Sequence, residues 1–102
     1  MDYNIIRRVC LAMASETIAE IQSVCFDLLR YESIESQMLR VYLHTRLLLL
    51  QPMEGNWVSN YNLIQRRTNI NKLESNHPLG EAIIEMAMNN LDLLHKKRWN
   101  IK

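Results

Sequence analysis

The sequence predicts an all-α fold in which antiparallel helical hairpins are joined by short connections. Only two glycines and two prolines interrupt the 102 residues, too few for the regularly spaced turns of an all-β protein. Apolar residues recur at steps of three and four positions along most of the chain, which is the spacing of a helix face. The length and the 48% share of hydrophobic residues suit a single helical domain, residues 1–102, with its own core.

The first two helices are predicted from two apolar rows. Asp2 is a suitable N-cap for the first helix, and Thr17 or Ser15 for the second. The rows consist of Ile5, Ile6, Val9, Cys10 and Met13, and of Ile18, Ile21, Cys25 and Leu28. Because Cys10 and Cys25 lack CxxC spacing, we expect both to be small buried hydrophobic residues of a protein in a reducing cytoplasm.

A third helix is predicted from residue 34, after the N-cap Ser33, to residue 50, where Gln51 precedes the helix-breaking Pro52. Its two adjacent rows are Ile34, Met38, Val41, Thr45 and Leu48, and Leu39, Tyr42, Leu43, Leu47 and Leu50. Such a helix is expected in the middle of a layer, with neighbours on both sides. The four consecutive leucines at 47–50 are expected to leave apolar surface that two neighbours do not cover.

The second half of the chain predicts a loop and two or three more helices. Residues 51–56, which include Gly55, form the loop, and Trp57, Tyr61 and Ile64 then define one face of a fourth helix. Residues 66–76 are rich in asparagine, which favours caps and turns, so only a short separate helix is expected there. Pro78 suits the first position of the last helix, with residue 76 or 77 near the cap. The rows of the last helix are Leu79, Ile83, Met86, Asn90 and Leu93, and Ile84, Ala87, Leu91 and Leu94.

The sequence contains no pattern typical of catalysis or of a metal site. His44, His77 and His95 are scattered and share no chelating spacing with the cysteines, and there is no glycine-rich phosphate loop. The N-terminus lacks the basic region and cleavage site of a signal peptide, and no apolar run approaches the ~18 residues of a membrane span. We therefore expect a non-enzymatic cytoplasmic protein that has no cofactor or metal and does not insert into a membrane.

Two alternative functions are compatible with the sequence. The segment 57–73 resembles part of a helix-turn-helix, with the polar and basic residues Gln65, Arg66, Arg67, Asn69, Asn71 and Lys72. Against DNA binding, the turn glycine is missing and the formal net charge is only +1. A self-associating helical protein, in which the apolar surface pairs with a second copy, is the other alternative.

Four segments, taken in order, resemble a known family. They are Thr17-Ile18-Ala19-Glu20, Glu35-Ser36-Gln37-Met38-Leu39-Arg40-Val41, Asn56-Trp57-Val58, and Asn76-His77-Pro78 followed by residues 83–91. They are similar to helix segments of the degenerate tetratricopeptide-like needle-subunit chaperones of type III secretion systems, the YscG/PscG type, and the resemblance spans residues 2–95. The sequence departs from that family in having few small residues at helix contacts and in having Tyr31 near the position of a turn glycine.

The resemblance implies a tetratricopeptide-like array of about five or six helices and a bacterial cytoplasmic chaperone. Such a chaperone, with a small helical co-chaperone, would mask the apolar helix of a needle subunit before export. Helix-in-groove binding is expected to use Tyr42, Leu43, Leu47, Leu50, Trp57, Tyr61 and Leu91. The co-chaperone is expected to contact Tyr3, Ile6 and Met13 of the first helix.

Overall fold

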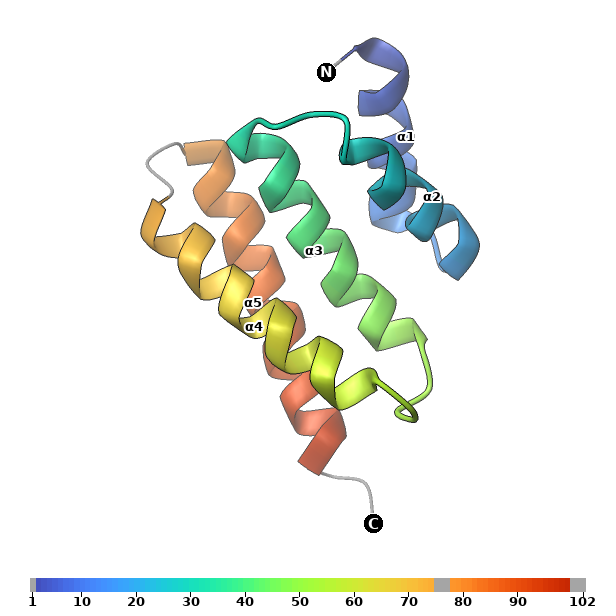
Figure 1. Cartoon of the computed structure of the whole chain (residues 1–102), viewed down its shortest axis with the longest axis vertical. Coiled ribbons are helices and arrows are strands. Elements are labelled where there is room, and N and C mark those ends of the chain that lie inside the picture. The colour runs from blue at the N-terminus through green and yellow to red at the C-terminus, as the bar shows by residue number, and fades with distance from the viewer. Residues whose placement is uncertain (1, 75–77, 100–102) are drawn as a thin grey trace.

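The computed structural model describes residues 2–74 and 78–99, and in these ranges it is helical and contains no strand (Figure 1). The helices are α1 (Tyr3–Ala14), α2 (Ile18–Leu28), α3 (Ile34–Leu50), α4 (Trp57–Glu74) and α5 (Pro78–Trp99). The all-α prediction is confirmed, and so is Pro78 as the first residue of the last helix. The predicted cap at residue 76 or 77 lies outside the described residues.

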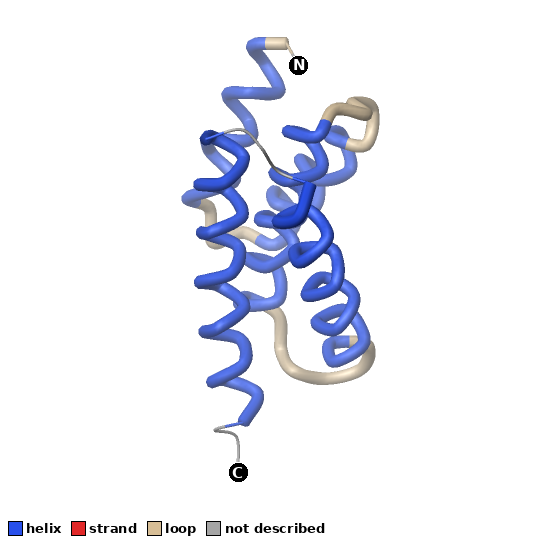
Figure 2. The backbone as a smooth tube through the Cα atoms, turned by 90° about the vertical axis from the view of Figure 1, so that its left-hand side faces the viewer, coloured by secondary structure: helices blue, strands red, loops and turns tan. Residues whose placement is uncertain are grey.

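α3 is the central helix of the fold, as its two apolar rows predict. All four other helices pack against it, with α1 and α2 on one side and α4 on the other (Figure 1). α5 lies along both α3 and α4, and in the side view it is the long helix that runs down to the C-terminus (Figure 2). The expectation that the leucine run leaves uncovered surface was wrong, because α5 adds a further neighbour. Leu47 and Leu48 are buried, and Leu49 and Leu50 are half-buried against the core.

The caps of the first three helices follow the sequence closely. Asp2 accepts a hydrogen bond from the backbone N–H of Ile5 at 3.0 Å, and this bond lowers the pKa of the Asp2 carboxyl. Ser33 Oγ accepts from the N–H three residues further on, at 3.2 Å. Thr17 is the N-cap residue of α2 but makes no side-chain capping bond; instead its own N–H donates to Ser15 Oγ at 3.0 Å.

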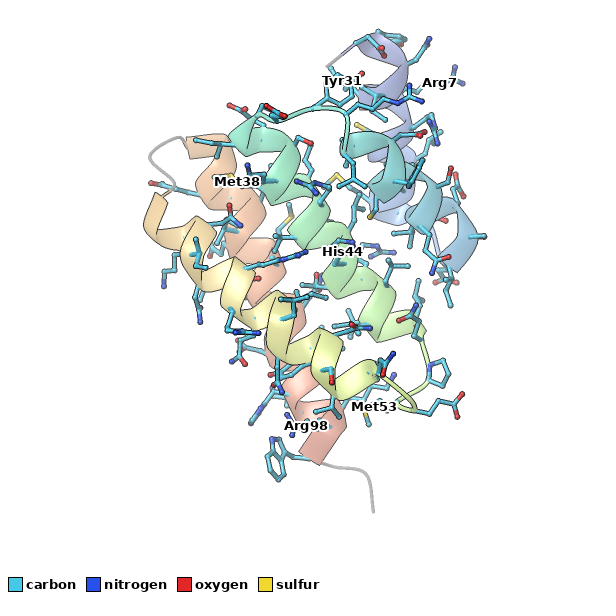
Figure 3. All side chains as sticks on the ribbon, in the orientation of Figure 1. Arg7, Tyr31, Met38, His44, Met53 and Arg98 are labelled. Atoms are coloured by element: carbon cyan, nitrogen blue, oxygen red, sulfur yellow. The ribbon has the colours of Figure 1, made fainter. Side chains whose placement is uncertain are left out.

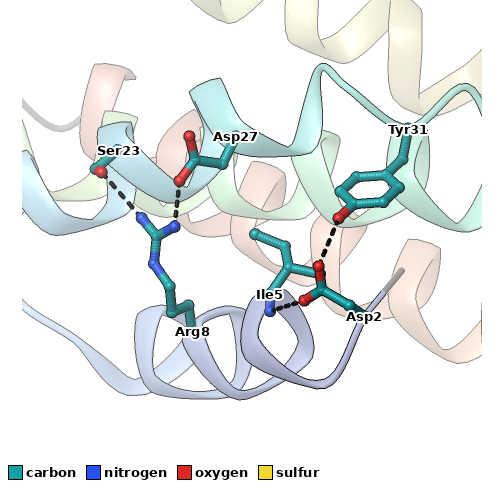
Figure 4. Close-up of polar contacts among 6 residues, drawn as sticks. All are labelled: Asp2, Ile5, Arg8, Ser23, Asp27 and Tyr31. Carbon is teal, nitrogen blue, oxygen red and sulfur yellow. Dashed lines mark hydrogen bonds and ion pairs between the residues drawn. The ribbon is translucent and has the colours of Figure 1, made fainter.

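Polar contacts join α1 to α2 and to the turn that follows it (Figure 4). Arg8 of α1 forms an ion pair with Asp27 and donates a hydrogen bond to Ser23 Oγ at 3.0 Å. The Tyr31 hydroxyl donates to the carboxylate of Asp2 at 3.3 Å. Partly exposed pairs of this kind contribute only about 0–1 kcal/mol to the free energy of unfolding. Their main effect is therefore on the orientation of α1 relative to α2.

We expected the fourth helix to be interrupted after residue 66, but α4 continues as one helix to residue 74. Two polar side chains within this stretch are buried and are satisfied by their own helix. Thr68 Oγ1 donates to the carbonyl of Ile64 and Asn71 Nδ2 to the carbonyl of Arg67, each at 2.8 Å. Packing against α3 and α5 supplies the stabilisation that low helix propensity does not.

The buried faces are narrower than predicted at two helices. In α1 the buried residues are Ile5, Val9 and Ala12, so Cys10 is exposed, contrary to expectation, whereas Cys25 of α2 is buried as predicted. α1 packs mainly on α2, and a helix with one main neighbour buries only one row. In α5 the second predicted row is buried together with Ile83, whereas Met86 and Leu93 face outward.

Buried side-chain hydrogen bonds link the central helices. Asn90 Nδ2 of α5 donates to Thr45 Oγ1 of α3 at 3.0 Å, and the Thr45 hydroxyl donates to the carbonyl of Tyr42. Trp57 Nε1, at the start of α4, donates to the carbonyl of Leu48 at 3.0 Å. These bonds satisfy polar groups that would otherwise be costly in the core.

Candidate partner-binding cleft

The residues predicted to line a partner groove belong to the core of this structure. Tyr42, Leu43, Leu47, Trp57, Tyr61 and Leu91 are buried, and Leu50 is half-buried. Trp57 stacks on Tyr61 with ring centroids 5.7 Å apart and an interplanar angle of 3°. Helices of the same chain therefore cover these side chains. Leu47 also lines the cleft between α2, α3 and α4 that is described below, so this part of the predicted site faces a hollow. The other six residues do not line that cleft, and for them the prediction needs correction, because an open groove there would require the core to separate.

The predicted co-chaperone contacts lie together on α1. Tyr3 and Ile6 are exposed, and Met13 is half-buried against the core. Since spacings of three and ten residues place all three on one helix face, they form an accessible apolar row. Binding of a co-chaperone to this row stays a prediction.

A cleft of about 510 Å³ lies between α2, α3 and α4. It follows from the arrangement of the helices: α2 and α4 each pack against α3, but no Cα atoms of α2 and α4 within the described residues come within 8 Å of each other. Four residues of α3 form the floor: Arg40 and His44, which are half-buried, and Leu47 and Leu48, which are buried. His44 lies on this part of α3, between α2 and α4 in the view of Figure 3.

Large apolar side chains stand on both rims of this α2–α4 cleft. Phe26 of α2 and Leu29, the C-cap residue of that helix, are 70% and 57% exposed, and Leu63 of α4 is 38% exposed. A single exposed apolar residue is ordinary on a protein surface, but three that border one concave site form a patch. Such a patch is typical of a surface that another apolar chain covers.

The floor and the α4 rim of the cleft carry positive charge. Arg40 and Arg67 supply this charge, His44 lies with them in the lining, and none of the described residues that line the cleft is acidic. Nε of Arg40 is buried and has no hydrogen-bond partner among the described residues. Burial lowers the pKa of His44, and the nearby charges of Arg67 and Arg40 lower it further. The cleft therefore combines an apolar rim with an unneutralised cationic centre.

A second hollow of about 290 Å³ extends the cleft between α3 and α4. It shares Arg40, His44 and Arg67 with the first hollow and reaches Ile70, which is 54% exposed. The two hollows thus meet at the basic residues. Together they form a groove with apolar side chains toward both ends and positive charge at its centre.

Cys25 is the only cysteine among the described residues that line the cleft, and its thiol has low reactivity. Burial raises the pKa of its thiol to about 11, and the Arg40 charge offsets this only in part. Among residues 2–74 and 78–99, no three His, Cys, Asp or Glu side chains are grouped so that they could hold a metal ion. Cys25 thus acts as a small neutral wall residue.

Comparison of the chain with protein-family models, with curated proteins and with solved structures found no match in any of the three. None of the helices in the part of the chain that the structure describes is long and apolar enough to cross a membrane.

The cleft residues that sequence reasoning missed do form a pattern. Gln22 and Phe26 of α2 and its C-cap residue Leu29 follow i, i+4, i+7 spacing, next to the buried row of that helix. Leu63, Arg67 and Ile70 follow the same spacing on α4. A second row with apolar members on each of two helices can indicate a shared binding surface. The sequence alone did not show that both rows border the same part of α3.

Proposed function

We propose that the protein is a protein-binding chaperone that accepts an apolar helix of its partner in the α2–α4 cleft. The apolar rim formed by Phe26, Leu29 and Leu63 is the observation that carries this proposal. A helix laid between α2 and α4 would contact both rims and the α3 floor, which is the helix-in-groove mode of recognition. It would also cover apolar surface that water otherwise contacts.

The proposed partner is the needle subunit of a bacterial type III secretion system, held in the cytoplasm together with a small helical co-chaperone. The sequence resemblance supports this finer assignment, and the cleft supports helix binding in general. A needle subunit associates through apolar helical faces, so a chaperone must cover one of them before export. The exposed row Tyr3, Ile6 and Met13 on α1 offers a separate surface for the co-chaperone.

Co-expression with the small proteins encoded beside this gene tests the proposal. We expect a complex of defined mass by light scattering after purification, and we expect Leu63→Glu to abolish it, because the change places a charge on the apolar rim. Leu93→Glu is the matched control, since Leu93 is 54% exposed on α5 and does not line the cleft. Loss of the complex in both variants, or in neither, would contradict the proposed site.

The structure changes which variants are informative. Glutamate at Leu43 and Leu47 is an obvious test of the groove predicted from the sequence, but both side chains are buried in the core. A buried unpaired charge is strongly destabilising, so this double variant is expected to unfold the protein. Its failure to bind would say nothing about the partner surface.

The two alternatives predicted from the sequence give different outcomes. A DNA-binding helix-turn-helix joins two helices by a short turn, whereas the segment 57–73, which carries this resemblance, lies within the single helix α4. If the protein nevertheless binds DNA, Arg66→Gln with Arg67→Gln will weaken binding and its salt dependence. A soluble homodimer that needs no partner would instead favour self-association.

A further inference from the structure

We infer that the helix bound in the α2–α4 cleft carries an acidic side chain within its apolar face, and that this carboxylate pairs with Arg40 and Arg67. The inference rests on the proposed function and deepens it, because it specifies the chemistry of the partner. In this arrangement the apolar rim supplies most of the binding affinity, and the basic centre selects helices that carry the acidic side chain.

The position of the basic residues supports a single acidic contact. Arg40 and His44 are one helical turn apart on α3, and Arg67 approaches the same place from α4. These three residues are shared by the two hollows, so they mark the centre of the groove. A helix lying along the groove would place apolar residues near Leu63 and Ile70 and one side chain from the turn between them near the arginines.

The charges around this point are not balanced within the described chain. Neither arginine has an acidic side chain at ion-pair distance among the described residues; the ion pair of Arg8 with Asp27 lies between α1 and α2. Burial is the largest cause of the lowered pKa of His44, and the nearby charges of Arg67 and Arg40 lower it further. A carboxylate from outside the chain would neutralise these charges and satisfy the guanidinium donors.

The apolar rim decides between a carboxylate on a helix and the phosphates of a nucleic acid. Phosphate recognition uses exposed basic and polar groups and leaves apolar side chains without a partner. Phe26 of α2 and its C-cap residue Leu29 are 70% and 57% exposed and line the same cleft as Arg40. An amphipathic helix with one embedded carboxylate complements both the apolar and the cationic parts of the surface.

A displayed peptide library tests this inference. The probe is a library of amphipathic helical peptides of about 18 residues, long enough to be helical when bound, with the apolar face randomised. It is selected on the wild-type protein, on Arg67→Met and on the matched control Arg66→Met, whose residue is exposed on α4 outside the cleft. Leu63→Glu reports whether selected peptides use the cleft at all. Circular dichroism confirms that each variant is folded.

We expect wild type and Arg66→Met to select apolar peptides that share an acidic residue at one position, and Arg67→Met to lose that preference. Replacing the acidic residue of a selected peptide by its amide should weaken binding to wild type about tenfold, and binding to Arg67→Met much less. Arg67→Glu should select a basic residue at the same position.

Other outcomes separate the inference from the proposed function. Selection of purely apolar peptides, sensitive to Leu63→Glu but not to Arg67→Met, would overturn the acidic contact and leave the helix-binding cleft intact. Peptides insensitive to Leu63→Glu, or no selection on any folded variant, would overturn both. Salt-dependent, Arg67-dependent binding of a mixed-sequence DNA duplex without any acidic preference among the peptides would overturn the inference in favour of phosphate recognition.

Discussion

Replacement of Thr45 by valine should weaken the contact between α3 and α5 measurably. The Thr45 side chain is fully buried, and its hydroxyl accepts a hydrogen bond from Asn90 Nδ2 at 3.0 Å. Valine keeps the shape of threonine but cannot accept this bond, so the Asn90 amide loses its described protein partner. An unsatisfied buried donor costs about 1–3 kcal/mol. Because Asn90 is only half-buried, we expect a loss near the lower end, about 1–2 kcal/mol.

Thr68→Val is the matched control for this prediction. Thr68 is equally buried, but its hydroxyl donates to the carbonyl of Ile64 one turn earlier in the same helix. The change removes a donor and leaves no orphaned amide, so we expect a loss of less than about 0.5 kcal/mol. Both changes are Thr→Val within a helix, so the intrinsic helix-propensity terms cancel in the comparison.

Urea unfolding followed by circular dichroism measures both free energies. The double variant Thr45→Val with Asn90→Leu completes the test, because it removes both partners and should recover much of the loss. Equal losses for Thr45→Val and Thr68→Val would refute this reasoning, as would additive losses for Thr45→Val and Asn90→Leu. Either result would mean that the inter-helix hydrogen bond contributes nothing specific.

Three further predictions concern single side chains. Trp57→Phe removes the N–H that donates to the Leu48 carbonyl and also one of the two fused rings of a buried side chain, so urea unfolding should show a loss of about 2–3 kcal/mol; no loss would contradict both the bond and the burial. An aromatic disulfide reagent should modify exposed Cys10 much faster than Cys25, which is buried and has a thiol pKa of about 11; equal rates in the folded protein would contradict the burial. Because the folded pKa of His44 lies below its ordinary value of 6.5, the unfolded state binds more protons, and the free energy of unfolding should fall as the pH drops below about 6.5. The urea midpoint of His44→Gln should depend less on pH than that of the wild type. The same pH dependence in both proteins would refute the pKa shift.

The helices and their caps could be predicted from the sequence because they depend on local signals. Asp2 and Ser33 cap helices as expected, and Pro52 follows shortly after the end of α3. Local propensity failed in the second half of α4, where buried Thr68 and Asn71 bond to carbonyls of their own helix. Tertiary packing there outweighs the preference of these residues for turns.

The site was harder to predict because it depends on which helices do not meet. The sequence correctly indicated that α3 is apolar around much of its circumference. It did not show that Leu43 of α3 and Leu91 of α5 would both be buried within the chain, or that α2 and α4 would stay apart over Arg40. An apolar row predicts burial against something, but the sequence spacing alone does not distinguish another helix of the chain from a partner.

Site-specific photocrosslinking tests the central claim, that the α2–α4 cleft is the surface that binds the partner's helix. A benzophenone amino acid replaces Leu63 at the cleft rim or, as the control, Leu93 on the outer face of α5, and each protein is irradiated in complex with the co-purified partner. Our account predicts a crosslink from position 63 into an apolar helical segment of the partner, and none from position 93. A crosslink from position 93 alone, or from neither position in an intact complex, would contradict it.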